Sequence, residues 1–168
     1  LQYEPFKKLD VYDRVVYIKS FSKVFLPGIR LGYIINPKVF REVMMSSKVN
    51  TDIATSTLMQ RSLEMYIKDG YWKGYISFLK NEYKMRYDLM KRLLEEELKE
   101  YVTFIDPKGG LTFYIKLKNK EINSEELFYR LKERKLYITP GSIFYTGTNE
   151  GNYSFRLRYS QVKKEDIR

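Results

Sequence analysis

Residues 20–33 of the chain read Ser20-Phe21-Ser22-Lys23-Val24-Phe25-Leu26-Pro27-Gly28-Ile29-Arg30-Leu31-Gly32-Tyr33. Ser20 and Ser22 supply two hydroxyls and Arg30 supplies a guanidinium fork, a combination that suits a phosphate dianion. Gly28 lets the backbone approach a ligand closely. A lysine beside a phosphate site has few chemical uses, and Schiff-base formation with a phosphorylated aldehyde is one of them. Lys23 is therefore either a surface lysine, as composition alone favours, or a residue that binds a cofactor covalently.

Two apolar runs flank this stretch. Residues 14–20 are rich in β-branched and aromatic side chains and predict a buried strand. Residues 31–35 form a second apolar run, which ends at Asn36-Pro37. Two short apolar strands joined by a polar, glycine-containing loop suit the interior of an α/β sheet. We therefore expect Lys23 to lie in a loop between two buried strands.

The remaining two thirds of the chain predict helices followed by a small α+β unit. Residues 38–68 are helical in two pieces, and residues 51–56 are either a break or a new helix start. Residues 71–100 form a long helix with one apolar face. Asn123-Ser124-Glu125-Glu126 resembles a capping box at the start of a later helix. Strands are predicted at 101–105, 111–117, 136–139 and 153–159, with turns at 106–110 and 140–141.

Residues 20–33 resemble the active-site lysine segment of fold-type I, pyridoxal-phosphate-dependent aminotransferases. The resemblance is to the class I/II branch with 2-aminoadipate and kynurenine aminotransferases, and equally to the aminotransferase-like domain of MocR-type transcriptional regulators. The family pattern is Ser-Phe-Ser-Lys, three residues, then Pro-Gly-x-Arg-x-Gly-Tyr, and this sequence has it without a gap. The resemblance implies that Lys23 is the catalytic lysine and binds pyridoxal 5'-phosphate covalently. It also implies that Ser20, Ser22 and Arg30 contact the cofactor phosphate.

Three later segments are similar to the same family. Residues 107–114 resemble the Gly-Gly-x-x-x-aromatic strand of its small domain, and residues 138–144 resemble its Pro-Gly-x-x-Phe turn. Residues 152–160 resemble the strand whose arginine binds the substrate α-carboxylate. The alignment implies that this arginine is Arg156, and Arg158 is its competitor because it points to the same face of a strand. A bidentate arginine–carboxylate pair is the physical reason for an arginine there.

The expected fold class is α/β, the C-terminal part of a pyridoxal-phosphate transferase fold. In that division, residues 1–70 are the end of the large-domain sheet with the lysine loop, 71–100 the interdomain helix, and 101–168 the small α+β domain. The resemblance covers only the second half of a family member, so we expect a C-terminal fragment. The aspartate for the pyridine nitrogen and the aromatic that stacks on the ring are not found in it. Asp10 and Asp13 are too near Lys23 in sequence for the aspartate role.

Two functions fit this resemblance. The first is an aminotransferase that moves an amino group between an amino acid and a 2-oxo acid, with the protein acting as a homodimer at full length. The second is an effector-sensing domain of a GntR/MocR-type regulator, which would bind DNA only through a further N-terminal domain. A third interpretation is a structural remnant without activity. We expect the chain alone to bind pyridoxal phosphate weakly or not at all, because half of the pocket is missing from it.

Composition restricts these functions further. The 168 residues are 43% hydrophobic and 16% aromatic, which indicates a globular chain. Cysteine and histidine are absent, so we expect no disulfide and no metal site of the usual ligands. The net charge of +10 comes from scattered lysines, many beside glutamates, which is typical of solvated helix faces. No apolar run approaches the ~20 residues of a membrane helix and no signal segment is visible, so we expect a cytoplasmic protein.

Overall fold

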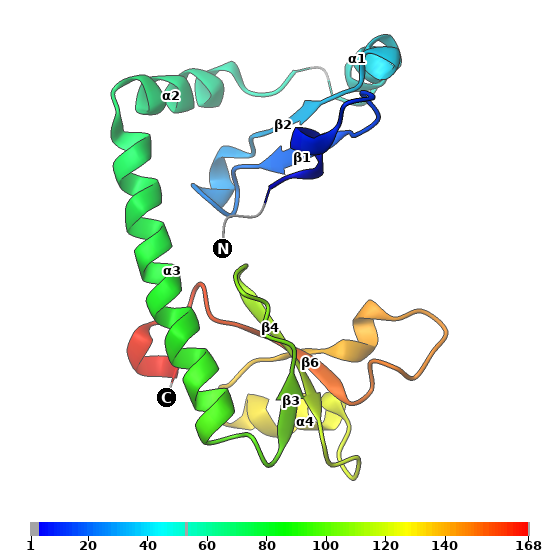
Figure 1. Cartoon of the computed structure of the whole chain (residues 1–168), viewed down its shortest axis with the longest axis vertical. Helices are drawn as coiled ribbons and strands as arrows, with labels where there is room; N and C mark the ends of the chain where they lie inside the picture. The colour runs from blue at the N-terminus through cyan, green and yellow to red at the C-terminus, as the bar shows by residue number, and fades with distance from the viewer. Residues whose placement is uncertain (1–3, 53, 168) are drawn as a thin grey trace. The chain divides into compact units, whose positions relative to one another are not determined.

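The computed structural model describes residues 4–52 and 54–167. The chain forms two compact units, Leu1–Leu79 and Lys80–Arg168, which meet inside a single long helix (Figure 1). The chain mixes helices with two antiparallel sheets, one in each unit. The three-part division predicted from the sequence, at residues 70 and 100, stays a prediction.

The first unit is built around a hairpin of two strands. Strands β1 and β2 pair antiparallel, with Tyr17 opposite Ile35 and Ser20 opposite Gly32. Gly32 is needed for this pairing because a Cβ there would lie 2.8 Å from the carbonyl oxygen of Lys19. The elements of this unit are η1 (Phe6–Leu9), β1 (Tyr17–Ser20), η2 (Pro27–Ile29), β2 (Gly32–Ile35), η3 (Lys38–Phe40), α1 (Arg41–Thr51), α2 (Thr57–Lys68) and the first part of α3 (Tyr71–Glu96).

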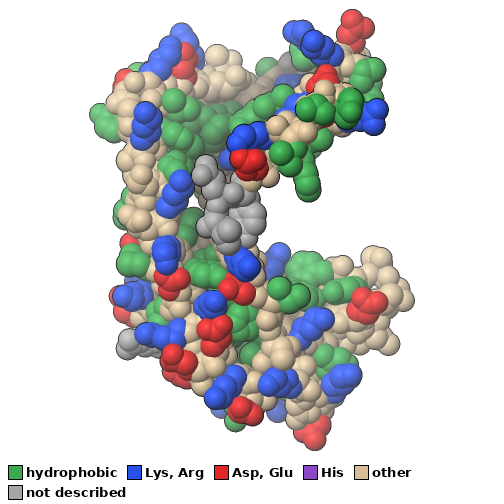
Figure 2. All heavy atoms as spheres, in the orientation of Figure 1, with side chains coloured by type: hydrophobic (Ala, Val, Ile, Leu, Met, Phe, Trp, Pro, Cys, Tyr) green, Lys and Arg blue, Asp and Glu red, His purple; other side chains and the backbone are tan. Residues whose placement is uncertain are grey.

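The prediction that these two strands are buried is wrong. Ile18 is 69% exposed and Ile34 is 48% exposed, although both are aliphatic and lie opposite each other. Apolar side chains lie on the visible surface over β1 and β2 (Figure 2). Among the described residues, each strand pairs only with the other and no second layer covers Ile18 or Ile34. Residue type indicated strand conformation correctly, but burial depends on what covers the strand.

An ionic network holds the segment before β1. The carboxylate of Asp10 accepts the backbone N–H of Arg14 at 2.9 Å and the ammonium of Lys7 at 2.9 Å. Asp13 accepts the same ammonium at 2.9 Å and the backbone N–H of Lys38 at 2.7 Å. The backbone N–H of Arg14, more than the Lys7 charge, holds the pKa of Asp10 well below its ordinary value. The two aspartates thus fix the chain entering β1 against the chain leaving β2.

The second unit has a four-stranded antiparallel sheet in the order β3-β4-β6-β5. One face of the sheet packs against the second part of α3 and against α4, and its centre is Phe113 and Ile115, both fully buried. The elements are β3 (Val102–Phe104), β4 (Thr112–Leu117), α4 (Ser124–Glu133), β5 (Thr139–Pro140), η4 (Gly141–Phe144), β6 (Ser154–Arg158) and η5 (Lys164–Ile167). The buried apolar residues of this core are Leu89, Met90, Leu94, Val102, Phe113, Ile115, Ile138, Phe155, Tyr159 and Ile167.

Two sequence predictions for this unit had different outcomes. The cap of α4 is confirmed, because the Asn123 side chain accepts the backbone N–H groups of Glu125 and Glu126 at 3.1 and 2.9 Å. The strand predicted at 136–139 is wrong for most of its length. Lys135 has a φ of 60°, and the N–H of Leu136 donates to the carbonyl of Leu131, so the chain turns back on α4 first. The strand β5 is only Thr139–Pro140.

Candidate cofactor and substrate site

The candidate cofactor residues lie at one end of the β1–β2 hairpin. Ser20 is the last residue of β1, and Ser22, Lys23 and Arg30 lie in the loop of residues 21–31, which we call the lysine loop. The N–H of Phe21 donates to the carbonyl of Leu31 at 3.0 Å, which closes the base of the loop. The N–H groups of Val24 and Phe25 both donate to the carbonyl of Phe21, at 3.2 and 2.8 Å. Lys23 therefore lies within a single tight turn at the end of the hairpin, and its side chain is exposed rather than enclosed.

The polar residues of this loop match the donors that a phosphate needs. The Ser20 hydroxyl accepts the backbone N–H of Ser22 at 3.1 Å, which leaves its own O–H group for donation. Arg30 follows η2 in the left-handed conformation, with φ 51° and ψ 37°, and this turns the chain into β2. The structure thus brings Ser20, Ser22, Lys23 and Arg30 to one end of the hairpin. This donor set of hydroxyls and a guanidinium fits a phosphate group.

An aromatic cluster, which the sequence analysis did not single out, supports the lysine loop from below. The ring of Phe25 lies 4.9 Å from that of Tyr66, 5.7 Å from that of Tyr75 and 5.9 Å from that of Trp72. The Tyr75 hydroxyl also donates to the carbonyl of Phe25 at 3.3 Å. Phe21 contacts Trp72 edge-on at 5.9 Å. In the sequence, these rings appear only as several aromatic residues on both sides of Gly70. That pattern does not indicate that they contact Phe25.

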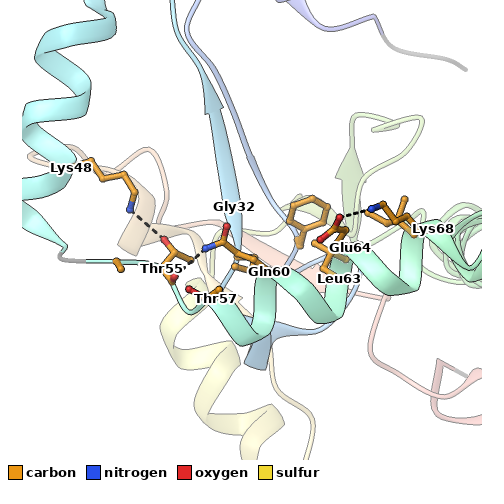
Figure 3. A pocket seen from close by; sticks show the side chains of 12 residues that line it. Gly32, Lys48, Thr55, Thr57, Gln60, Leu63, Glu64 and Lys68 are labelled. Atoms are coloured by element: carbon orange, nitrogen blue, oxygen red, sulfur yellow. Dashed lines mark hydrogen bonds and ion pairs between the residues drawn. The ribbon is translucent and has the colours of Figure 1, made fainter.

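A groove of about 810 Å³ lies beside the base of the loop (Figure 3). Phe21, Leu31 and Gly32 form its hairpin side, and α2 contributes residues that include Gln60 and Leu63. Several polar side chains of its rim are already paired. Lys48 contacts Thr55 at 3.2 Å, Gln60 donates to the Thr55 carbonyl at 3.0 Å, and Glu64 pairs with Lys68 at 2.6 Å. None of Ser20, Ser22, Lys23 or Arg30 lines this groove, so it is separate from the candidate phosphate donors.

The candidate substrate residue, Arg156, belongs to the second unit. It lies on β6, is exposed, and stands opposite Tyr114 of β4 and Thr139 of β5. Its guanidinium carbon lies 4.8 Å from the ring centroid of Phe144, a cation–π distance. Phe144 comes from η4, which follows the predicted Pro-Gly turn. That turn therefore supplies the aromatic ring beside which Arg156 lies.

Arg158 shares this face of the sheet with Arg156, as the alternation of a strand predicts. It stands opposite Thr112, and its Nη1 donates to the Gln161 side chain at 2.8 Å. Both arginines are exposed. This face of the sheet therefore has two guanidinium groups, although the family resemblance implies only one carboxylate-binding arginine.

Two further features are absent from the described residues, 4–52 and 54–167. No group of three or more acidic, histidine or cysteine side chains is arranged to bind a metal ion in that part of the chain. No helix within it is long and apolar enough to span a bilayer.

The lysine loop and the sheet with Arg156 are features of a known fold. The model of the aminotransferase class I and II family matches residues 3–168, and the chain belongs to this family. A multiple-substrate aminotransferase from Thermococcus profundus superimposes with a TM-score of 0.88 and 30% identity, over 98% of this chain and 40% of that one. The α-aminoadipate aminotransferase LysN of Thermus thermophilus, solved with N-(5'-phosphopyridoxyl)-L-leucine, gives a TM-score of 0.85 and 26% identity over 96% and 41%. The predicted α/β fold class is thereby confirmed.

The curated relatives are of two kinds. One is an uncharacterized HTH-type transcriptional regulator, YdfD of Bacillus subtilis, 32% identical over 97% of this chain and 33% of its own length. Another is the aromatic-amino-acid aminotransferase 1 of Thermococcus litoralis, 29% identical over 98% of this chain and 39% of its own length. The chain thus spans about a third to two fifths of the length of the relatives it matches. The family is dependent on pyridoxal phosphate.

Proposed function

We propose that this chain supplies the cofactor lysine and the carboxylate-binding arginine of a pyridoxal-phosphate-dependent aminotransferase. The observation that carries the proposal is the hairpin end at which Ser20, Ser22, Lys23 and Arg30 meet, in the order that the family motif requires. The family match over residues 3–168 supports it. A homodimer, and an amino acid and a 2-oxo acid as substrates, are parts of this proposal.

Each residue has a defined task in this function. The hydroxyls of Ser20 and Ser22 and the Arg30 guanidinium bind the phosphate of the cofactor and fix its position. The Nζ of Lys23 would hold the cofactor and, once released, accept the proton from the substrate Cα and return it. Arg156 orients the substrate through its α-carboxylate. When bound, pyridoxal phosphate acts as the electron sink that makes this Cα acidic.

Covalent labelling tests the role of Lys23 even when binding is weak. The chain is incubated with excess pyridoxal phosphate, the imines formed are then reduced with borohydride, and the modified lysines are located by peptide mass spectrometry. We expect a larger fraction of Lys23 than of Lys19 to be labelled. Lys19 is the matched control, because it is an exposed lysine of the same hairpin and has no role in the proposed phosphate site. Arg30→Gln is expected to lower labelling at Lys23 alone. Equal labelling of Lys23 and Lys19, with no effect of Arg30→Gln, would contradict the proposal.

The regulator alternative has a specific observation in its favour, the 32% identity to an HTH-type regulator. In that function the same lysine, serines and arginines would bind cofactor and an amine without turnover, and DNA would be bound by a separate domain. The amount of 2-oxo acid formed per cofactor separates the two. A transaminase forms many equivalents when a second 2-oxo acid is supplied, whereas a sensor forms at most one.

A further inference from the structure

Lys23 lies between two phenylalanines whose rings contact the same tryptophan. Phe21 precedes the lysine by two residues and Phe25 follows it by two. The ring centroids of both phenylalanines lie 5.9 Å from that of Trp72, with interplanar angles of 77° and 58°. Trp72 belongs to the first turn of α3 and is half-buried. A single indole ring therefore contacts the lysine loop both before and after the candidate cofactor lysine.

The same two phenylalanines also fix the backbone that carries Lys23. The N–H of Phe25 donates to the carbonyl of Phe21 at 2.8 Å, which closes the turn around the lysine. The N–H of Phe21 donates in its turn to the carbonyl of Leu31 at 3.0 Å, at the base of the loop. Tilted and edge-on aromatic pairs at these distances are stabilising contacts. Trp72 thus holds a turn that hydrogen bonds have already closed, and Lys23 is at the centre of that turn.

The position of this turn matters because the Lys23 side chain is exposed. A lysine side chain is a flexible four-carbon stem, so the position of its backbone sets the region that its Nζ can reach. An amine reacts quickly with a bound aldehyde only when the two groups are held close to each other, which raises their effective concentration. The rings of Phe21, Phe25 and Trp72 therefore decide how well Lys23 is placed relative to the phosphate donors of the hairpin end.

We propose that Trp72 is a positioning residue for Lys23. Through the rings of Phe21 and Phe25 it holds the Lys23 Nζ within reach of an aldehyde whose phosphate is bound at the hairpin end. This rests on the proposed function, which assigns the phosphate to Ser20, Ser22 and Arg30. In the step that Trp72 favours, the amine attacks the aldehyde carbon, a C=N bond forms and water leaves. Trp72 acts on this step only through the two phenylalanines.

The test compares two aldehydes on the 168-residue chain. Pyridoxal phosphate and pyridoxal differ by the phosphate group, and each is incubated with the chain before borohydride transfers hydride to the C=N carbon. Peptide mass spectrometry then gives the ratio of labelled Lys23 to labelled Lys19. In the unchanged chain we expect this ratio to be about fivefold higher with pyridoxal phosphate than with pyridoxal. In Trp72→Leu we expect this phosphate-dependent advantage to fall to about twofold or less.

Tyr71→Leu is the matched control. Tyr71 lies in the same turn of α3, but its ring contacts that of Tyr66, at 5.6 Å, and not a ring of the lysine loop. We expect this variant to keep the full advantage. The amide NMR signals of β1 and β2 show in each variant whether the hairpin is formed. An undiminished advantage in Trp72→Leu with the hairpin formed overturns the proposal, and so does an equal fall in Tyr71→Leu.

Trp72→Phe decides the matter if Trp72→Leu loses the hairpin. Phenylalanine keeps a smaller ring at this position, so we expect the hairpin to form and the advantage to lie between those of the unchanged chain and Trp72→Leu. An advantage equal to that of the unchanged chain overturns the proposal. Loss of the hairpin in both variants also contradicts it, because Trp72 would then be needed for folding rather than for positioning Lys23. If the unchanged chain shows no advantage with pyridoxal phosphate, the proposed function itself fails.

Discussion

The two units of the chain differ in how they are held together. The second unit, Lys80–Arg168, contains ten of the twelve hydrophobic residues that are buried in the described chain. The other two, Leu31 and Leu63, lie in the first unit. The first unit also contains most of the large apolar residues that are exposed. Burial of apolar area is the main stabilising term for a fold. The second unit therefore has a core of its own, whereas the first depends on hydrogen bonds, ion pairs and contacts between aromatic rings.

Those contacts lie next to the candidate cofactor residues. The Lys7–Asp10–Asp13 network fixes the entry into β1, and the rings around Phe25 support the lysine loop. The residues of the proposed cofactor site are therefore ordered by hydrogen bonds and aromatic contacts rather than by a hydrophobic core. The proposed carboxylate-binding residue, Arg156, in contrast lies on a sheet whose other face packs on the hydrophobic core of the second unit.

The largest expected effect on stability comes from a substitution in the hydrophobic core of the second unit. Phe113 is fully buried, stacks on Tyr87 at 5.3 Å and contacts Phe104 and Tyr159 at 5.4 and 5.6 Å. Phe113→Ala should cost about 3–5 kcal/mol, because it removes this contact area and leaves a cavity. Urea unfolding followed by the backbone amide NMR signals of β4 and β6, which lie in the second unit, measures it.

The first unit supplies an independent probe for the same experiment. Trp72 is the single tryptophan of the chain, and its ring contacts Phe21 and Phe25. We expect its fluorescence midpoint to stay in place in Phe113→Ala, and also in the milder Phe113→Leu. If the midpoints of the Trp72 fluorescence and of the β4 and β6 amide signals move together, the two units unfold as one and do not differ in stability.

A second test uses glycines, for which the two units should respond with opposite signs. Gly141 faces Gly151 so closely that a Cβ on Gly141 would lie 2.6 Å from the carbonyl oxygens of Gly151 and Ser154. Gly141→Ala should therefore destabilise the second unit by about 1–3 kcal/mol. Gly74 lies in α3 with nothing within 4 Å of its would-be Cβ. Gly74→Ala should stabilise the first unit by about 0.5–1 kcal/mol.

Thermal unfolding of both variants with the two probes distinguishes them. We expect Gly141→Ala to shift the unfolding midpoint of the β4 and β6 amide signals, and Gly74→Ala to shift that of the Trp72 fluorescence. A stable Gly141→Ala protein would mean that the loop carrying Gly151 moves away at little cost. In that case the second unit would be less closely packed than its core indicates.

Local features of the chain could be predicted from the sequence, and long-range ones could not. The Asn123 cap, the turns at Pro27 and at Gly109–Gly110, and the long α3 depend on neighbours within a few residues. The alternation of 153–159 likewise placed Arg156 and Arg158 on one face. The exposure of the apolar side chains of β1 and β2 was not predicted. The sequence pattern indicates a strand but not whether another layer packs on it.

The same limit explains the parts of the candidate site that were missed. Phe25 and Tyr75 are fifty residues apart, and only the fold brings the hydroxyl of one to the carbonyl of the other. The cation–π contact of Arg156 similarly needs η4 to return beside β6. The motif therefore predicts which residues carry the proposed chemistry, and the structure was needed to find which contacts support them.

The smallest expected effect is the loss of stability at low pH through Asp106, in the loop that follows β3. Asp106 accepts hydrogen bonds from the Lys91 ammonium at 2.7 Å, from the Tyr87 hydroxyl and from the Lys108 N–H at 2.9 Å. These bonds, with that of Lys91 first, hold the pKa of Asp106 well below its ordinary 3.8. Burial raises the pKa of Tyr87 to about 12, so its hydroxyl keeps the proton it donates.

The sign of the pH effect follows from that lowered pKa. Near pH 3.8 the unfolded chain binds more protons at Asp106 than the folded chain, so this contribution is present above that pH and is lost as the pH falls below it. Asp106→Asn should lower the urea midpoint of the second unit at neutral pH, and the difference from the unchanged chain should shrink in acid. Asp88, an exposed partner of Lys84 on the same helix, is the matched control, and Asp88→Asn should change little. A constant difference for Asp106→Asn at every pH would show that shape, not charge, holds the loop on α3. The second unit would then owe its order to packing alone, and the contrast with the ion-paired entry of the first unit would be sharper still.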